Sequence, residues 1–291
     1  MEAAGSVGPD EANMSELFLG TSSWSTSGWV GPFYPPGTRS ADYLPHYATQ
    51  FRAVEADVTY YRVPSRSMVQ GWRDRTPDGF VLTAKFPRSI VHAGEGPRPD
   101  ASRLLLPEFV RGDTELFCEA MSELGEKCGP LVLQFPYFNK SAFPEAGGFL
   151  DRLDAFLEAL PSGHRYAVEI RNKAWLTEEF TGLLRRHEVG LVLVEMSYMP
   201  HPAEVSRRLD LITSDFLYGR LIGDRKVVEA HTKVFDQVVV DQSESLTRWA
   251  SLLGALSERV TRTYVFANNH YAGHGPETIR ELGRLLGAGD V

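Results

Sequence analysis

Carboxylate and cationic side chains lie together near the ends of several short apolar runs of this chain. Glu169 and Arg171 alternate with apolar residues in one run, and Asp57 lies in another. A carboxylate beside a cation stays ionised, whereas one with less charge compensation can hold a proton, and glycosidic and similar hydrolysis uses this difference. Glu169 is therefore the first candidate for acid–base catalysis and Asp57 the second.

Basic residues occur at the ends of the same runs, although the formal net charge of the chain is −8. Arg171, Arg220 and Lys85 are candidates for holding an anionic group, because guanidinium and ammonium groups bind phosphate and carboxylate. Other candidates for substrate binding are polar or aromatic: Gln134, Tyr61, Trp24, Asn268, Asn269 and His92. These residues predict a small anionic substrate, such as a sugar phosphate or a nucleotide.

Metal and cofactor motifs are scarce. Catalytic zinc usually has three protein ligands, and the sequence contains neither His-x-His nor His-Glu-x-x-His. A divalent cation held loosely by carboxylates is a further possibility, with Glu169 and Glu195 as its candidate ligands. Because the chain lacks a Gly-rich phosphate loop and a dinucleotide fingerprint, no nucleotide cofactor is predicted, and the cofactor is otherwise unknown.

Eight strand-like runs position these residues, and segments with mostly helical periodicity separate them. The expected strands are Leu17–Trp24, Ala53–Tyr61, Phe80–Phe86, Gly129–Pro136, Arg165–Asn172, Gly190–Ser197, Phe216–Gly223 and Thr263–His270. This alternation predicts an α/β fold, a single (β/α)₈ TIM-type barrel. In that fold the active site lies at the carboxyl ends of the strands, where the candidate residues stand.

Side-chain alternation predicts which residues point into the barrel, since the apolar face of each strand should pack against helices. The expected inward residues are Glu55, Asp57, Thr59, Tyr61, Thr83, Lys85, Gln134, Glu169, Arg171, Tyr218 and Arg220, with Glu195 placed near the mouth. Enclosed charges are costly unless they are paired. They indicate either a functional site or a structural ion-pair network, and for Glu55 both interpretations stay open.

Three segments depart from the regular alternation. Residues 87–112, rich in Pro and Arg, form a long excursion after the third strand, and we interpret them as a lid loop over the barrel mouth. The sixth crossover, Met199–Leu211, is short and holds Pro200 and Pro202, so its helix should be short or irregular. Residues 1–16 are interpreted as a flexible tail, and 17–291 as one barrel domain.

Composition narrows the class of protein. The chain has 43% hydrophobic residues, and no apolar run approaches the length of a membrane helix. Its two cysteines form neither a Cys-x-x-Cys pair nor a disulfide framework, which predicts a cytoplasmic location. The negative net charge disfavours a broad surface that binds nucleic acid, and nucleic acid stays open as a less favoured partner. No membrane partner is predicted, and the oligomeric state stays open.

Motifs at the strand ends follow a specific order. They include Gly20-Thr21-Ser22-Ser23-Trp24, Val54-Glu55 with Thr59-Tyr60-Tyr61-Arg62, Lys85 with Ser89-Ile90 and His92, Gln134-Phe135-Pro136, Glu169 with Arg171 and Trp175, Arg220 with Gly223, and Asn268-Asn269. From about Leu17 to the C-terminus the chain resembles domain-of-unknown-function family 72, the YecE-like proteins. The resemblance implies a TIM-type barrel but no activity. Asp57 stands where that family usually has Asn, and Ile222 where it often has His.

Three hypotheses on function follow. The leading one is a hydrolase or isomerase that acts on a small polar anionic substrate at the barrel mouth. Comparison of the family with metal-dependent barrels implies a first alternative, a metal-assisted, endonuclease IV-like phosphodiesterase acting on nucleic acid. The second alternative is a non-catalytic ligand-binding barrel.

Overall fold

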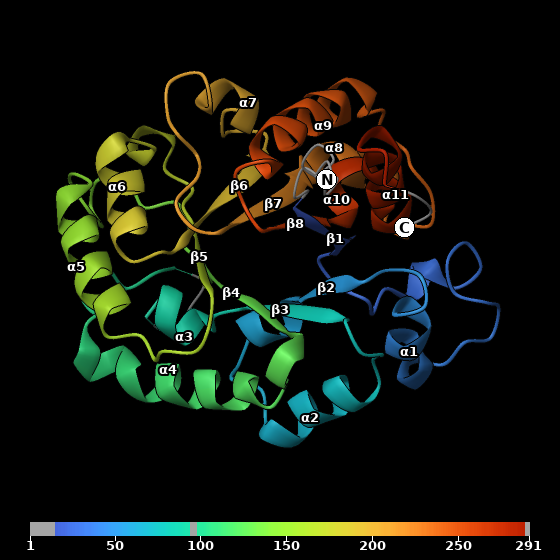
Figure 1. The fold of residues 1–291 in the computed structure, drawn as a ribbon, viewed down its shortest axis with the longest axis horizontal. Coiled ribbons are helices and arrows are strands. Elements are labelled where there is room, and N and C mark those ends of the chain that lie inside the picture. The colour runs from blue at the N-terminus through green and yellow to red at the C-terminus, as the bar shows by residue number, and fades with distance from the viewer. Residues whose placement is uncertain (1–14, 94–97, 289–291) are drawn as a thin grey trace, which may run out of the picture.

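The computed structural model of the protein describes residues 15–93 and 98–288. Eight parallel strands lie at the centre of the molecule, and helices surround them (Figure 1). Hydrogen-bonded neighbours follow the order β1-β8-β7-β6-β5-β4-β3-β2. The predicted TIM-type barrel is therefore confirmed. The strands are β1 Glu16–Thr21, β2 Ala53–Ala56, β3 Val81–Lys85, β4 Cys128–Gln134, β5 Tyr166–Glu169, β6 Gly190–Met196, β7 Phe216–Gly223 and β8 Arg262–Ala267.

Helices fill the intervals that showed helical periodicity. They are α1 Tyr43–Tyr47, α2 Arg66–Asp74, α3 Arg88–Val91, α4 Pro107–Ser122, α5 Gly147–Glu158, α6 Glu178–Arg186, α7 Pro202–Val205, α8 Arg225–His231, α9 Ser243–Ser257, α10 Asn269–Ala272 and α11 Gly275–Leu285. Thr177 caps the amino end of α6, because its side chain accepts a hydrogen bond from the Phe180 amide. The sixth crossover holds only the four-residue α7, as predicted. Within the described residues, the structure has no helix with the length and apolar character needed to span a membrane.

The barrel closes between β1 and β2 through a tyrosine. The Thr21 amide donates to the Tyr47 hydroxyl at 2.8 Å, and this hydroxyl donates to the Ala53 carbonyl at 3.2 Å. A Cβ atom on Gly20 would lie 2.0 Å from the Ala53 carbonyl oxygen. The two backbones therefore come close together only because residue 20 is glycine.

Two apolar layers form the core. One lies between the strands and the helices, and Val54, Val168 and Leu193 belong to it. The other fills the barrel interior: Phe18, Ala53, Val81, Val132, Ala167, Val192, Phe216, Tyr218, Tyr264 and Phe266. The rings of Phe18 and Tyr264 stack there with centroids 5.1 Å apart. This inner layer closes the interior below the carboxyl ends of the strands.

Four strands end three or more residues earlier than predicted: the first at Thr21, the fifth at Glu169, and the second and eighth, which bear on the site. The second strand ends at Ala56 and not at Tyr61, because the chain turns there into a 3₁₀ helix, Asp57–Tyr60. The Thr59 side chain accepts a hydrogen bond from the Lys85 amide at 3.1 Å, and its hydroxyl lies 2.7 Å from the Lys85 carbonyl. The Thr59 hydroxyl thereby occupies hydrogen-bonding groups of β3 that a continued β2 backbone would otherwise pair with. The alternation of side chains between the two faces of the strand therefore stops at Ala56. Val58, which alternation would place against the helices, is exposed.

The eighth strand ends at Ala267 and not at His270. Asn268 caps α10 by accepting from the His270 amide at 2.9 Å, so these residues begin a helix. The excursion after β3 is partly helical, because α3 lies within it and α4 already begins at Pro107. Its proposed role as a lid stays a prediction, and residues 94–97 lie outside the described residues. Of the tail predicted over residues 1–16, residues 1–14 lie outside the described residues. The first strand, β1, begins at Glu16.

Candidate active site at the carboxyl ends of the strands

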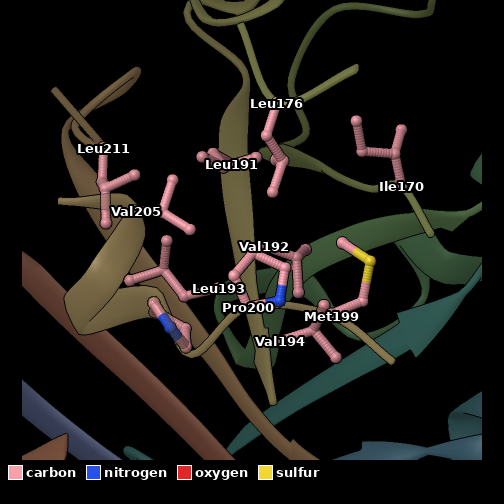
Figure 2. A pocket seen from close by; sticks show the side chains of 11 residues that line it. Ile170, Leu176, Leu191, Val192, Leu193, Val194, Met199, Pro200, Val205 and Leu211 are labelled. Atoms are coloured by element: carbon pink, nitrogen blue, oxygen red, sulfur yellow. The ribbon is translucent and has the colours of Figure 1, made fainter. Parts of the chain in front are cut away.

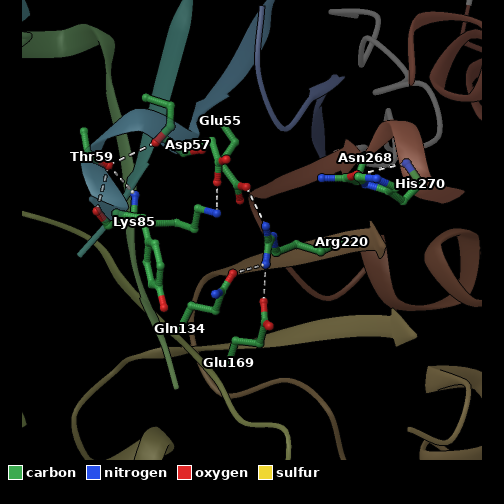
Figure 3. Close-up of polar contacts among 12 residues, drawn as sticks. Glu55, Asp57, Thr59, Lys85, Gln134, Glu169, Arg220, Asn268 and His270 are labelled. Carbon is green, nitrogen blue, oxygen red and sulfur yellow. Dashed lines mark hydrogen bonds and ion pairs between the residues drawn. The ribbon is translucent and has the colours of Figure 1, made fainter. Parts of the chain in front are cut away.

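Charged side chains from β2, β5 and β7 meet inside the barrel above the apolar layer (Figure 3). Arg220 donates from Nη2 to Glu55 Oε1 at 2.8 Å, and from Nη1 to Glu169 Oε2 at 2.5 Å and Gln134 Oε1 at 2.7 Å. Both carboxylates are fully buried, and Arg220 is 2% exposed. One guanidinium therefore joins three strands through two carboxylates and an amide. We call Glu55, Gln134, Glu169 and Arg220 the Arg220 cluster.

The pKa directions follow from these contacts. Burial alone would raise the pKa of Glu169, but Arg220 and Arg171 together hold it below its usual value. Burial would lower the pKa of Arg220, and the carboxylates of Glu55 and Glu169 raise it instead. The second oxygen of Glu55 accepts from the Tyr218 hydroxyl at 2.8 Å, which lies 2.9 Å from the Thr83 hydroxyl. Glu169 and Arg220 are therefore ionised, and Glu55 ties the cluster to the layer beneath it.

A second group of charges lies at the solvent edge. Lys85 is nearly buried and forms an ion pair with Asp57, whose side chain is 39% exposed. Arg171 donates from Nε to Glu169 Oε1 at 2.9 Å, and its terminal nitrogens have no hydrogen bond to the described residues. Asp57 is thus the more accessible of the two predicted catalytic carboxylates, whereas guanidinium groups contact both oxygens of Glu169.

Tyr60 and His92 extend this edge. Their Oη and Nε2 atoms are 2.8 Å apart, and the Lys85 ammonium lies 5.4 Å from the Tyr60 ring centroid. Burial, Arg171 and Arg88 lower the pKa of His92 to about 4, so its ring is neutral at physiological pH. From the sequence, Tyr60 was named only as part of a motif and was not paired with His92. The pair forms because α3 folds back towards the end of β2, which strand alternation cannot indicate.

Several predicted site residues take other positions. Tyr61 is 65% exposed and does not line the interior, because β2 ends before it. Trp24 is half-buried and packs edge-on against Trp72, with ring centroids 5.6 Å apart. The side chain of Asn269 accepts from Trp29 Nε1 and the Gly275 amide, a structural arrangement. Asn268 accepts from the backbone of the following helix and remains half-buried.

Glu195 lies outside the barrel wall. It accepts hydrogen bonds from Ser245 at 2.7 Å, from Trp249 Nε1 at 2.6 Å and from the Tyr271 hydroxyl at 2.8 Å. These partners belong to α9 and α10, so Glu195 points towards the helices and not into the mouth. Within residues 15–93 and 98–288, no three His, Cys, Asp or Glu side chains are placed to hold a metal ion together.

Two hollows lie away from this site. A small pocket of about 20 Å³ between β6 and the segment around α7 is lined by apolar side chains that include Leu193, Met199 and Val205 (Figure 2). A wider hollow contains Glu16 and Arg262 from the amino ends of β1 and β8. The first offers no titratable side chain, and the second lies at the opposite end of the strands from Glu169. The charged mouth is therefore the better candidate for chemistry.

Known proteins resemble the chain over most of its length. The model of the family "Protein of unknown function DUF72" matches residues 18–290. UPF0759 protein YecE of Escherichia coli K12 is 30% identical over 188 residues, which cover 63% of this chain and 60% of YecE. The chain thus matches less than two thirds of the length of that relative.

Solved structures show the same architecture. A DUF72 family protein from Thermotoga maritima is 28% identical and superposes with a TM-score of 0.71, covering 94% of this chain and 99% of that one. D-psicose 3-epimerase, solved in the presence of D-fructose, has a TM-score of 0.50 at 11% identity, with 87% of this chain and 95% of the epimerase covered. The latter likeness shows the fold alone.

Proposed function

The chain belongs to the DUF72 family, and from its site we propose that it is an acid–base enzyme acting on a small polar anionic substrate at the barrel mouth. The reaction is an isomerisation or a hydrolysis, and a sugar phosphate is the substrate class that suits the site best. No activity is established for the family, so this proposal depends on the geometry of the mouth.

The observation that carries the proposal is the charge at the solvent edge. The terminal nitrogens of Arg171 have no hydrogen bond to the described residues, and Arg88 lies near enough to lower the pKa of the same histidine. The nearby carboxylates already have cationic partners among the described residues. Glu55 and Glu169 contact Arg220, Glu169 also contacts Arg171, and Asp57 contacts Lys85. An entering phosphate would therefore meet two guanidinium groups at a partly exposed edge.

The two predicted catalytic carboxylates suit different tasks. Glu169 has a lowered pKa and both oxygens contact guanidinium groups, so it is better placed to orient Arg171 than to exchange protons. Asp57 is partly exposed, and among the described residues its ion-pair partner is the Lys85 ammonium. We therefore assign Asp57 as the general base and Lys85 as the cation that pairs with it. The sequence made Glu169 the first candidate for acid–base catalysis and Asp57 the second, and this assignment reverses that order.

Two features favour a sugar as the body of the substrate. Trp24 and Tyr60 are half-buried aromatic residues at the ends of β1 and β2, where a sugar ring could pack against them. D-psicose 3-epimerase shares the fold at low identity, which supports a sugar substrate only by analogy.

Two measurements test the proposal. Phosphate should raise the melting temperature of the wild-type protein, because a ligand selective for the native state stabilises it. Arg171→Met should weaken phosphate binding by about tenfold or more, since a charge-assisted hydrogen bond contributes about 1.5–3 kcal/mol. Arg186→Met is the matched control, because Arg186 pairs with Asp154 on the helical surface.

Turnover is tested by incubating the protein with a panel of sugar phosphates in D₂O. Isomerisation incorporates deuterium beside the carbonyl group, and hydrolysis releases inorganic phosphate that ³¹P NMR detects. Asp57→Asn should abolish either signal. Binding without any turnover would identify a ligand-binding barrel, and wild-type protein that binds neither phosphate nor sugar phosphates would defeat the proposal.

A further inference from the structure

The proposed function uses only the ring of Tyr60, whereas its hydroxyl forms a hydrogen-bonded pair with His92. Tyr60 ends the 3₁₀ helix after β2, and His92 directly follows α3. Their rings meet edge-on with centroids 5.8 Å apart and an interplanar angle of 82°. His92 is 8% exposed and Tyr60 is half-buried, so the tyrosine is the more accessible of the two.

The surroundings of His92 indicate which ring nitrogen carries the proton. Its Nδ1 atom is buried and has no partner among the described residues, whereas Nε2 contacts Tyr60. Orphaned buried N–H groups are rare, and an unsatisfied acceptor is tolerated more often. The neutral ring should therefore carry its proton on Nε2 and donate to the Tyr60 oxygen. The tyrosine hydroxyl then keeps its own hydrogen for another acceptor.

Cations lie near the Tyr60 side chain. The Lys85 ammonium lies 5.4 Å from the Tyr60 ring centroid. Burial raises the pKa of Tyr60, while Arg171 and Arg88 oppose that rise. Tyr60 is thus protonated at neutral pH, and the same cations would stabilise the tyrosinate that remains after it gives up its proton.

We infer that Tyr60 is a catalytic proton donor of this site and that His92 is its positioning residue. The inference rests on the proposed function and narrows the substrate to an anionic hydroxycarbonyl compound. Asp57 removes a proton from the carbon beside the carbonyl group, and the electron pair of that C–H bond forms the new C=C bond. The carbonyl π electrons move to oxygen, which takes the proton from Tyr60. Solvent returns a proton to the tyrosinate.

The first test is the protonation of the histidine ring. In full-length protein labelled with ¹⁵N in the histidine rings, the His92 signal is assigned by its loss in His92→Gln. We expect the neutral tautomer with the proton on Nε2. A proton on Nδ1 would overturn the inference, because the Tyr60 hydrogen would then be donated to the histidine.

The second test uses inorganic phosphate as the probe. Without a sugar body, an oxygen of inorganic phosphate should accept from the Tyr60 hydroxyl in place of the carbonyl oxygen. Tyr60→Phe should therefore lower the affinity for phosphate about tenfold, as expected for the loss of a hydrogen bond to a charged group. The matched control is Tyr198→Phe, because Tyr198 is 50% exposed. His92→Leu should weaken binding like Tyr60→Phe, and His92→Gln should restore it to within about twofold, because its amide can again donate to Tyr60.

The results separate this inference from the proposed function. If wild-type protein does not bind phosphate, the proposed function fails. If it binds phosphate and Tyr60→Phe binds equally well, only the role of Tyr60 fails. Thermal melts accompany each titration, and a tyrosine ¹³Cζ signal that changes in His92→Leu and returns in His92→Gln distinguishes positioning from general support of the fold.

Discussion

The lower and upper halves of the barrel interior are built from the same strands but differ in chemistry. On β5, Ala167 belongs to the inner apolar layer, and Glu169, two residues further, is a buried carboxylate. On β7, Phe216 packs in that layer and Arg220 carries a buried charge. Each strand thus changes from apolar to charged on one face as it approaches the mouth.

This difference shows that the charges are not required to fill the interior. Buried ion pairs recover little more than their desolvation cost, and apolar residues of similar volume often stabilise a protein as well. The lower half demonstrates that these strands accept an apolar filling. We therefore propose that the Arg220 cluster is arranged for a task at the mouth, and the following predictions test this contrast.

The largest effect is expected from Arg220→Met. Glu55 and Glu169 would remain buried without their shared cation, which should lower the free energy of unfolding by about 3–5 kcal/mol. Urea denaturation measures the change. A loss below about 1 kcal/mol, the range of exposed ion pairs, would show that water reaches the cluster.

The triple variant Glu55→Leu, Arg220→Met and Glu169→Leu makes the upper half resemble the lower one. We expect it to recover the stability lost in Arg220→Met and to come within about 1 kcal/mol of wild type, or to exceed it. Tyr218 loses Glu55 as an acceptor but keeps its contact with Thr83. A triple variant as unstable as the single one would mean that the charges themselves hold the barrel together.

An intermediate effect is expected from Glu169→Gln. Because the folded-state pKa of Glu169 is lowered, its carboxylate stabilises the protein above the unfolded pKa and loses that effect as the pH falls through the folded pKa. At pH 7 the variant should lose about 2 kcal/mol, and the gap to wild type should close below about pH 4. A gap that stays constant in acid would contradict the lowered pKa.

A smaller effect is expected from Glu195→Gln. The carboxylate lies outside the barrel wall and its hydrogen bonds come from Ser245, Trp249 and Tyr271, so an amide oxygen can keep part of them. Stability should fall by about 1–2 kcal/mol, and phosphate affinity should not change. Altered phosphate binding would show that α9 and α10 help to position the mouth.

The smallest change in stability is expected from Arg171→Met. Arg171 is 23% exposed and forms one ion pair, so its removal should cost at most about 1 kcal/mol. Chemical denaturation measures this value beside the phosphate titration. A loss of several kcal/mol would place Arg171 among the stabilising residues of the Arg220 cluster instead of at the binding edge.

Strand alternation was sufficient to predict the Arg220 cluster. The sequence places Glu55, Lys85, Gln134, Glu169 and Arg220 on inward positions, and all five are buried there. Each of these strands is short and its apolar face is clear, so a period of two residues determines the direction of the side chains.

Positions beyond the strand ends could not be predicted in this way. The end of β2 depends on a contact between Thr59 and Lys85, which are distant in sequence. The pairing of Tyr60 with His92 depends on how two loops fold towards each other. The direction of Glu195 could not be predicted because both faces of β6 are apolar, so alternation does not show which face points inward. Its hydrogen-bonding partners come from helices that follow much later in the chain.

The first strand forms its ladder with the last one, with Glu16 opposite Arg262. Towards β2, its next strand in the chain, Tyr47 supplies the bridging contact instead of a ladder. During synthesis, β1 therefore leaves the ribosome long before its partner exists. A released fragment that stops before residue 262 would expose the hydrogen-bonding groups of β1 and β7. Such unpaired edges promote association between chains, so truncated chains of this protein should need chaperones more than complete ones do.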